Sequence, residues 1–265
     1  MGPVIRYLIL WLTEACNLRC CYCYRPAVMT PKTMSGEVLE QALGLAARSG
    51  RPFHVQLSGG EPTLVPELIE QTAELLRDSG LSYTLGLQTN GTRLTPDLVH
   101  LFRRHGIQVG ISLDGPPPIH ESLRGAFAQT LAGMQLLEAW HVPFRVTTVV
   151  SAASVGTLDL LVLLAGGFQW CRGIALDLLT VKESALKGGV APPGPDALRD
   201  GLKRLWQSLV FVNRHRRHPL RLRELDALLR AKQKSTPSPF CHAARGESLA
   251  VRPDGAVFPC GQVVG

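Results

Sequence analysis

The chain has 265 residues, a hydrophobic content of 45% and a formal net charge of +7 at pH 7. This length fits one α/β barrel or two modest domains, and the apolar content is typical of a globular protein with a substantial core. Four of the seven cysteines lie between positions 16 and 23. That layout excludes a secreted disulfide framework and indicates a reducing compartment and a metal site.

An apolar segment opens the sequence at residues 4–12. It is too short to span a bilayer and lacks the small-residue cleavage site of a targeting peptide. We therefore predict a buried first strand and a cytoplasmic protein without a membrane partner.

Strand and helix patterns alternate along the sequence up to residue 178. Apolar runs predict further strands over 53–57, 83–87, 107–113, 144–150 and 174–178. Apolar spacing predicts helices over 34–48, 64–78, 95–104, 127–139 and 155–164. This alternation builds parallel sheets with right-handed crossovers. Six units, not eight, predict an α/β fold with an open, partial (β/α)6 barrel of the TIM type, whose active site lies at the carboxyl ends of the strands.

Composition divides the chain into a barrel over 1–180, a middle segment over 181–239 and a short tail over 240–265. The middle segment contains a Gly- and Pro-rich loop at 182–195, a helix or two over 196–234 and a linker at 235–239. Residues 203–234 hold ten Lys or Arg against two acids. Because no aromatic pattern accompanies this charge, a solvated helix face is favoured over a nucleic-acid surface.

Cys16, Cys20 and Cys23 have the spacing C-x3-C-x2-C. Three thiolates so close together can hold three irons of a cubane 4Fe–4S cluster and leave the fourth iron open to a small molecule. The alternatives are a zinc knuckle or a chance cluster, but zinc sites usually use two cysteine pairs, and the sequence has no second pair. The neighbouring Cys21 is interpreted as a packing residue.

This stretch resembles the radical S-adenosylmethionine (radical SAM) enzymes, in which the same loop follows the first barrel strand. The resemblance implies that the open iron binds S-adenosylmethionine and that one electron from the cluster cleaves it to a 5′-deoxyadenosyl radical. It also implies that the aromatic residue before the third cysteine, here Tyr22, borders the adenine.

Two further motifs end predicted strands. Ser58-Gly59-Gly60-Glu61-Pro62 resembles the Gly-Gly-Glu-Pro motif of the family, which implies that Gly59, Gly60 and Glu61 hold the amino group of the cofactor. A plain Gly-Gly turn is the alternative. Thr89-Asn90-Gly91 is explained by an Asn-Gly turn, although the family often has this tripeptide here, which would place Asn90 beside the site.

Ser112-Leu113-Asp114-Gly115-Pro116, followed by His120 and Arg124, resembles a stretch of the peptide-modifying and sulfatase-maturing members. It implies that Ser112 faces the ribose or carboxylate of the cofactor and that Arg124 pairs with the carboxylate. A turn and a salt bridge are the alternatives. Asp177, near the end of the sixth strand, is a candidate proton acceptor or a structural residue.

The tail from Cys241 to Cys260 predicts a β-hairpin that turns at Pro253-Asp254-Gly255. It resembles the opening of the SPASM or Twitch auxiliary-cluster module, in which the two cysteines ligate an additional iron–sulfur cluster. Such modules continue to further cysteines, whereas this sequence ends five residues after Cys260. An auxiliary cluster would therefore need other ligands or be a smaller 2Fe–2S type. Without one, the two cysteines are simply buried.

The leading hypothesis is a radical SAM oxidoreductase that modifies a peptide or protein, as the maturases of ribosomal peptides and sulfatases do. It implies an external electron donor of the flavodoxin or ferredoxin type. Because the sequence begins just before the first strand, we expect a precursor peptide to be recognised by the barrel rim, the basic stretch or a separate leader-peptide-binding protein. Alternatives are a small-molecule radical SAM dehydrogenase or cofactor-biosynthesis cyclase, RNA modification, and an iron–sulfur protein without catalytic activity.

Overall fold

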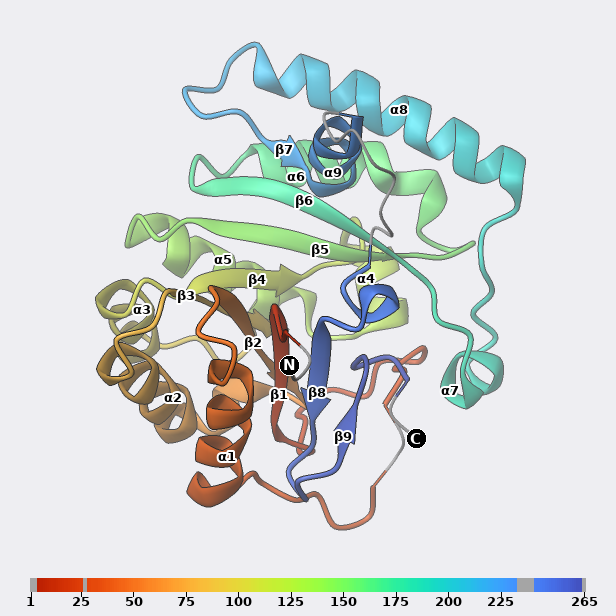
Figure 1. Cartoon of the computed structure of the whole chain (residues 1–265). Coiled ribbons are helices and arrows are strands. Elements are labelled where there is room, and N and C mark those ends of the chain that lie inside the picture. Colours follow the sequence, from red (N-terminus) through yellow and green to blue (C-terminus); the bar gives the residue numbers. More distant parts are fainter. Residues whose placement is uncertain (1–3, 26–27, 233–240, 264–265) are drawn as a thin grey trace.

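The computed structural model describes residues 4–25, 28–232 and 241–263. Within these residues the strands form one nine-stranded sheet in the order β7-β6-β5-β4-β3-β2-β1-β8-β9 (Figure 1). The strands are β1 (Tyr7–Thr13), β2 (Phe53–Gly59), β3 (Tyr83–Thr89), β4 (Gln108–Ser112), β5 (Phe144–Val150), β6 (Cys171–Leu178), β7 (Arg221–Leu222), β8 (Ser248–Val251) and β9 (Val257–Phe258). All neighbours are parallel except β8 and β9. The predicted α/β partial barrel is confirmed.

Helices connect the parallel strands and cover the outer face of the sheet (Figure 1). They are α1 (Gly36–Ala47), α2 (Pro66–Asp78), α3 (Pro96–Arg104), α4 (Pro117–Leu123), α5 (Phe127–Ala139), α6 (Leu158–Gly166), α7 (Glu183–Lys187), α8 (Pro195–Asn213) and α9 (Arg223–Lys232). Short 3-10 turns are η1 (Pro62–Leu64), η2 (Val155–Thr157) and η3 (Ala243–Arg245). Because η1 and η2 occupy the first residues of two predicted helices, α2 and α6 begin later than predicted.

Local sequence signals explain where these helices start and stop. Ser35 and Thr95 cap α1 and α3, each accepting a bond from a backbone N–H three residues on. These caps satisfy donors that the first turn leaves free. Pro96 occupies the first turn of α3, where a missing N–H is not needed. Gly50 follows α1 with φ 60°, a conformation that ends a helix readily.

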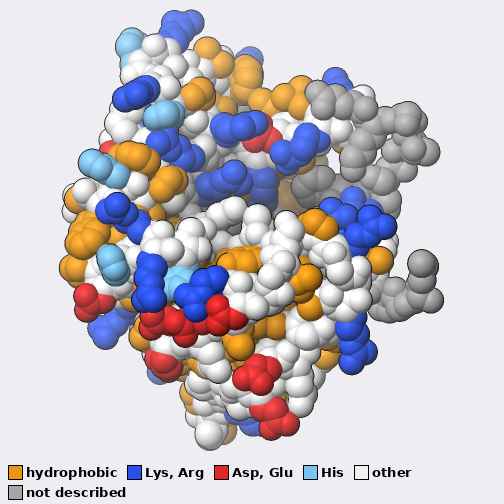
Figure 2. Space-filling view, turned by 60° about the vertical axis from the view of Figure 1, so that its left-hand side comes forward, with side chains coloured by type: hydrophobic (Ala, Val, Ile, Leu, Met, Phe, Trp, Pro, Cys, Tyr) orange, Lys and Arg blue, Asp and Glu red, His pale blue; other side chains and the backbone are white. Residues whose placement is uncertain are grey.

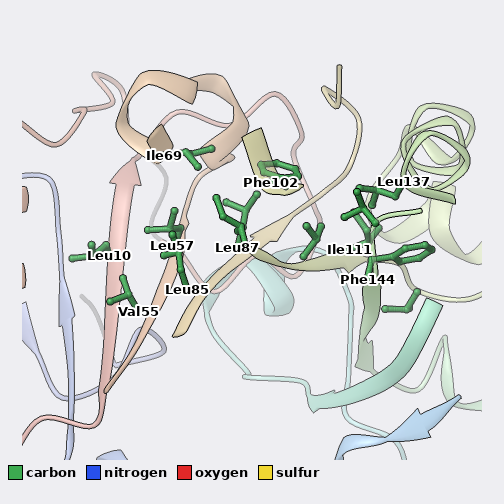
Figure 3. Close-up of a cluster of buried hydrophobic side chains, with 14 of the residues drawn as sticks. Leu10, Val55, Leu57, Ile69, Leu85, Leu87, Phe102, Ile111, Leu137 and Phe144 are labelled. Carbon is green, nitrogen blue, oxygen red and sulfur yellow. The ribbon is translucent and has the colours of Figure 1, made fainter. Parts of the chain in front are cut away.

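The two faces of the strands have different chemistry. Residues on the outer face pack under the helices and form the hydrophobic core, drawn in Figure 3 with Leu10, Val55, Leu57, Ile69, Leu85, Leu87, Phe102, Ile111, Leu137 and Phe144 labelled. The opposite face carries polar residues such as Gln56, Gln88 and Thr147, which alternate with the core residues along their strands. The inside of the barrel is therefore polar enough to hold a site.

Three parts of the structure differ from the sequence prediction. The short helices α4 and α7 were not predicted, and α7 lies inside the segment predicted as loop 182–195. The tail does form the predicted hairpin, but β8 also pairs in parallel with β1 along Tyr7–Leu10. No local pattern reveals that pairing, because the two strands are some 240 residues apart. The predicted linker 235–239 lies outside the described residues.

Candidate active site

The cysteine loop, residues 16–23, follows β1 and is held by the end of β2. The Gly60 N–H donates to the Thr13 carbonyl (2.6 Å), and the Glu61 N–H donates to the Ala15 carbonyl (2.8 Å). The two residues whose carbonyls accept these bonds come shortly before Cys16 in the sequence. The Gly-Gly-Glu motif therefore fixes the point at which the loop leaves the barrel.

This attachment requires two glycines. A Cβ on Gly60 would lie 1.7 Å from the Ala15 oxygen, and one on Gly59 would lie 2.5 Å from the Thr13 oxygen. Gly59 also has φ 123°, which side-chain-bearing residues rarely adopt. The glycines thus allow two backbone segments to approach each other. Their predicted contact with the amino group of the cofactor stays a prediction.

The three predicted cluster ligands, Cys16, Cys20 and Cys23, are all partly exposed in this loop. Burial raises the pKa of Cys20 to about 11 and raises the pKa of Cys16, and the negative charges of the other loop cysteines raise both further. Their thiolates therefore need a positive partner, as iron would be. Across the described residues, no three His, Cys, Asp or Glu side chains converge on a single ion.

Asp114 is the buried centre of the neighbouring part of the site. Its side chain is completely buried and pairs with Arg124 (Nε–Oδ2, 2.7 Å), while the Tyr22 hydroxyl donates to the same carboxylate. The Val149 N–H and the Thr148 hydroxyl donate to its other oxygen. In this structure Arg124 therefore pairs with Asp114. Its predicted contact with a cofactor carboxylate stays a prediction.

Glu61 forms a second buried centre. Its carboxylate is 1% exposed and accepts bonds from the backbone N–H and hydroxyl of Thr63, the Thr89 hydroxyl (2.6 Å) and the Asn90 N–H (2.7 Å). Burial raises the pKa of Glu61, and these donors lower it. Asn90 in turn donates through its side chain to Asn17 (3.0 Å), which follows Cys16. Glu61 and Asn90 thus connect the end of β3 to the cysteine loop.

Ser112 faces the polar interior from the end of β4. Its hydroxyl accepts a bond from Gln88 Nε2 (2.9 Å), and Gln88 Oε1 accepts one from the Thr147 hydroxyl (3.2 Å). Gly110 makes room for this glutamine, because a Cβ there would lie 2.4 Å from Gln88 Oε1. These three hydrogen-bonded side chains come from β3, β4 and β5 and supply donors and acceptors inside the barrel.

Asp177, the candidate proton acceptor, lies near the carboxyl end of β6 with 38% of its side chain exposed. Arg223 of α9 donates to its carboxylate and to the Leu176 carbonyl (2.7 and 2.8 Å). Burial raises the pKa values of Tyr7 and Tyr24 to about 12, and the charge of Asp177 contributes to both shifts.

The tail meets the cysteine loop through a buried ion pair. Arg252, at the end of β8, donates to Glu14 (Nη2–Oε1, 2.8 Å), and the other Glu14 oxygen accepts the Lys32 N–H (3.0 Å). Glu14 is two residues before Cys16. The two tail cysteines differ in exposure, since Cys241 is exposed and Cys260 is partly buried.

Five residues of this site were missed by the sequence prediction. They are Glu14, Asn17, Gln88, Arg223 and Arg252. Glu14 and Asn17 flank the first cysteine, and that position alone could have indicated them. Arg223 and Arg252 act on residues 46 and 238 positions away, so no local signal indicates them.

The sequence profile described as the Radical SAM superfamily matches residues 12–150, more than half of the chain. The chain belongs to the radical SAM superfamily. This family uses a 4Fe–4S cluster and S-adenosylmethionine. The matched region begins at the end of β1 and includes the cysteine loop, Glu61 and Asp114.

Three relatives are informative. The chain is 28% identical to the uncharacterized protein MJ0907 of Methanocaldococcus jannaschii over 97% of this chain and 85% of that protein. It is 28% identical to the serine-type anaerobic sulfatase-maturating enzyme of Klebsiella aerogenes over 94% of this chain and 65% of that enzyme. It is 38% identical to the AdoMet-dependent heme synthase of Methanosarcina barkeri, but over 54% of this chain and 42% of that enzyme.

A solved structure shares the fold of the whole chain. The maturase anSMEcpe with bound AdoMet and the Cp18Cys peptide superposes with a TM-score of 0.78 and 24% identity, over 99% of this chain and 75% of that chain. Because the superposition covers nearly the whole chain, the shared fold includes the tail hairpin as well as the barrel. Within the described residues, no helix is both long and apolar enough to cross a membrane.

Proposed function

We propose that this enzyme removes a hydrogen atom from a side-chain or backbone carbon of a peptide or protein. The observation that carries the proposal is the extent of the similarity. Two sulfatase-maturating enzymes match 92–94% of the chain, and a third matches 51% of it. The heme synthase and the molybdenum cofactor biosynthesis protein 1 match 54% of it.

The residues around the cysteine loop support the roles that the motifs predict. Cys16, Cys20 and Cys23 would hold the 4Fe–4S cluster, and Tyr22, Asn90 and Ser112 would border the cofactor beside it. Tyr22 is held by Asp114, Asn90 by Asn17 and Ser112 by Gln88. When bound, the cluster and S-adenosylmethionine supply the radical that abstracts hydrogen. The polar side chains on the inner face of the barrel would orient the substrate.

Asp177 is the proposed proton acceptor for the oxidised substrate. Its carboxylate is partly exposed, faces the barrel interior and is oriented by Arg223 (2.7 Å), so it can accept a proton without first leaving a buried pair.

The test separates radical formation from substrate oxidation. Protein reconstituted anaerobically with iron and sulfide is reduced in the presence of S-adenosylmethionine and of a peptide containing Ser or Cys. We expect cofactor cleavage together with a mass change of the peptide. Cys16→Ala should lose both, because one cluster ligand is missing, and undiminished cleavage by this variant would refute the family chemistry.

Asp177→Asn should keep cofactor cleavage and lose peptide product. The matched control is Asp226→Asn, which removes a carboxylate from another Asp–Arg pair, that with Arg221. It should leave both reactions unchanged. A product yield from Asp177→Asn equal to that of the control would exclude Asp177 as the proton acceptor.

A small-molecule substrate is the second candidate, because the barrel alone is 38% identical to the heme synthase. It predicts cofactor cleavage without any change in the mass of supplied peptides. In either case we propose an external donor of the flavodoxin or ferredoxin type as the source of the electron. Where the substrate is a precursor with a leader peptide, we propose that a separate protein binds that leader.

We propose that Cys241 and Cys260 ligate an auxiliary iron–sulfur cluster. Both are free thiols, and Cys260 lies near enough to Tyr7 to raise its pKa. Iron and sulfide counts on the wild type and on a Cys241→Ser/Cys260→Ser variant test this directly. Equal iron content in the two proteins would mean that the tail cysteines hold no cluster.

A further inference from the structure

A pocket lies at the opposite edge of the sheet from the cysteine loop. Its volume is about 420 Å³, and it is lined by Gln169, Trp170, Arg172, His215, Arg217 and His218. These residues belong to the start of β6 and to the loop after α8. Since β6 has eight residues, the pocket is about 20 Å from the catalytic edge, at about 3.3 Å per residue.

Arg172 is the most informative residue in this pocket. Its guanidinium lies over the Trp170 ring, 4.7 Å from the centroid, and His141 stacks on the same ring at 5.2 Å. The Arg172 Nη1 atom is buried and has no hydrogen-bond partner among the described residues. Six other buried side-chain atoms of the described residues also lack a partner. What distinguishes Arg172 is that its unpaired donor belongs to a pocket lined by a second arginine and two histidines.

The surrounding charge is positive. Arg216 lies beside the pocket and uses its own donors on the backbone carbonyls of Gly166, Phe168, Gln169 and Cys171. Partial desolvation and the positive charges of Arg172, Arg217 and Arg216 lower the pKa of His218. The nearby acid Glu138 accepts bonds from the Gln169 and Trp170 N–H groups, and no acid lines the pocket.

The space-filling view of this face agrees with the contacts. Figure 2 turns the left-hand side of Figure 1, where β5 and β6 begin, toward the reader. Lys and Arg side chains cross the middle and upper parts of this face with His side chains beside them, and most Asp and Glu side chains lie below (Figure 2). Arg217 and His218, two of the basic residues that line the pocket, are exposed to solvent.

We propose that this pocket binds the phosphate group of a small molecule. Arginine forks and imidazole N–H groups are suited to phosphate oxygens, and the volume is that of a small-ligand site. Because two partners already stack on the Trp170 ring, the ring offers little free face for a nucleic-acid base. A phosphate oxygen at Arg172 Nη1 would satisfy the one donor that the protein leaves unpaired there.

The test is a calorimetric titration of the full-length protein with inorganic phosphate and pyrophosphate. We expect saturable binding with a Kd of about 1 mM or tighter. Arg172→Met and Arg217→Met should each weaken it at least about tenfold, because a charge-assisted bond is lost. Arg217 is exposed, so its variant tests the pocket even where Arg172→Met lowers folding stability.

The matched control is Lys203→Met, which removes the same charge from an exposed position on α8 outside the pocket. It should bind pyrophosphate like the wild type. Absence of binding by the wild type, or equal affinity in the two arginine variants, would overturn the proposal. So would binding of a single-stranded oligonucleotide that Lys203→Met weakens as much as the arginine variants do, because the ligand would then be a long polyanion on a diffuse surface.

Discussion

The buried carboxylates at one edge of the sheet and the buried arginine at the other are partnered differently. At the carboxyl edge, Asp114 and Glu61 are buried, and each has its carboxylate oxygens occupied by donors of the protein. At the amino edge, a buried donor of Arg172 has no acceptor. The protein itself supplies the hydrogen-bond partners of the two carboxylates. The acceptor for the Arg172 donor would instead come from the ligand that we propose.

This difference follows from what each edge has to bind. The carboxyl edge must hold three thiols, and the residues around the cofactor site, in place before the cluster is inserted. Its charges are therefore neutralised internally, and the loop is fixed by backbone bonds. A pocket for an anion works differently, because the ligand brings the missing charge. Internal pairing would abolish its affinity.

The largest effect on the carboxyl edge is expected from Asp114→Asn. This change leaves Arg124 with its positive charge buried and uncompensated, so the free energy of unfolding should fall by about 3–5 kcal/mol. Urea unfolding measures the loss. The control Asp226→Asn opens a pair whose arginine is 64% exposed, and it should cost no more than about 1 kcal/mol. Similar losses in the two variants would mean that the buried network does not stabilise this edge.

Gly60→Ala tests the attachment of the cysteine loop. Its Cβ would lie 1.7 Å from the Ala15 oxygen, so the loop must move, at a cost of about 3 kcal/mol. We also expect less iron per chain after reconstitution. Gly44→Ala is the control, because nothing lies within 4 Å of a Cβ there, and it should leave iron content unchanged and slightly stabilise α1. A normal iron content in Gly60→Ala would argue against this role.

Arg252→Met tests whether the tail supports the cysteine loop independently of any auxiliary cluster. It keeps the apolar stem but leaves the Glu14 carboxylate, which is 5% exposed, without its ion pair, at a cost of about 2 kcal/mol. Iron should then be lost to a chelator faster than from the wild type. If the Cys241→Ser/Cys260→Ser variant loses iron from the catalytic loop at the same rate, the cysteines rather than the ion pair provide the support.

A pH dependence of stability is expected from His120. Burial and the charge of Arg124 lower its pKa from 6.5 to about 4, although Asp114 and Glu121 oppose this. Between these values the unfolded chain binds the proton more readily, so stability should be complete above pH 6.5, decline toward pH 4 and then level off. Thermal unfolding across this range checks it. His120→Asn should remove that part of the decline, and parallel curves for the two proteins would contradict the assignment.

Much of the barrel could be predicted because its signals are local. Alternating strand and helix patterns, capping residues such as Ser35 and Thr95, and the C-x3-C-x2-C spacing each lie within a few residues, and so does the Gly59-Gly60 turn. The roles of particular residues were harder to predict. Arg124 was expected to face the cofactor and pairs with Asp114, and the glycines were expected to face a ligand and contact backbone.

The sequence by itself indicated the family chemistry, because three closely spaced thiols occur together with the Gly-Gly-Glu-Pro and Ser-x-Asp-Gly-Pro motifs, and all of these signals are local. It also determined the alternation of strands and helices in the barrel, since each element has its own local hydrophobic pattern. Only the tertiary structure decided that β8 joins β1, that Arg252 meets Glu14 and that Arg172 has no acceptor. These contacts depend on which surfaces meet in the folded protein. A residue's local sequence carries no pattern that reveals a partner more than 200 residues away.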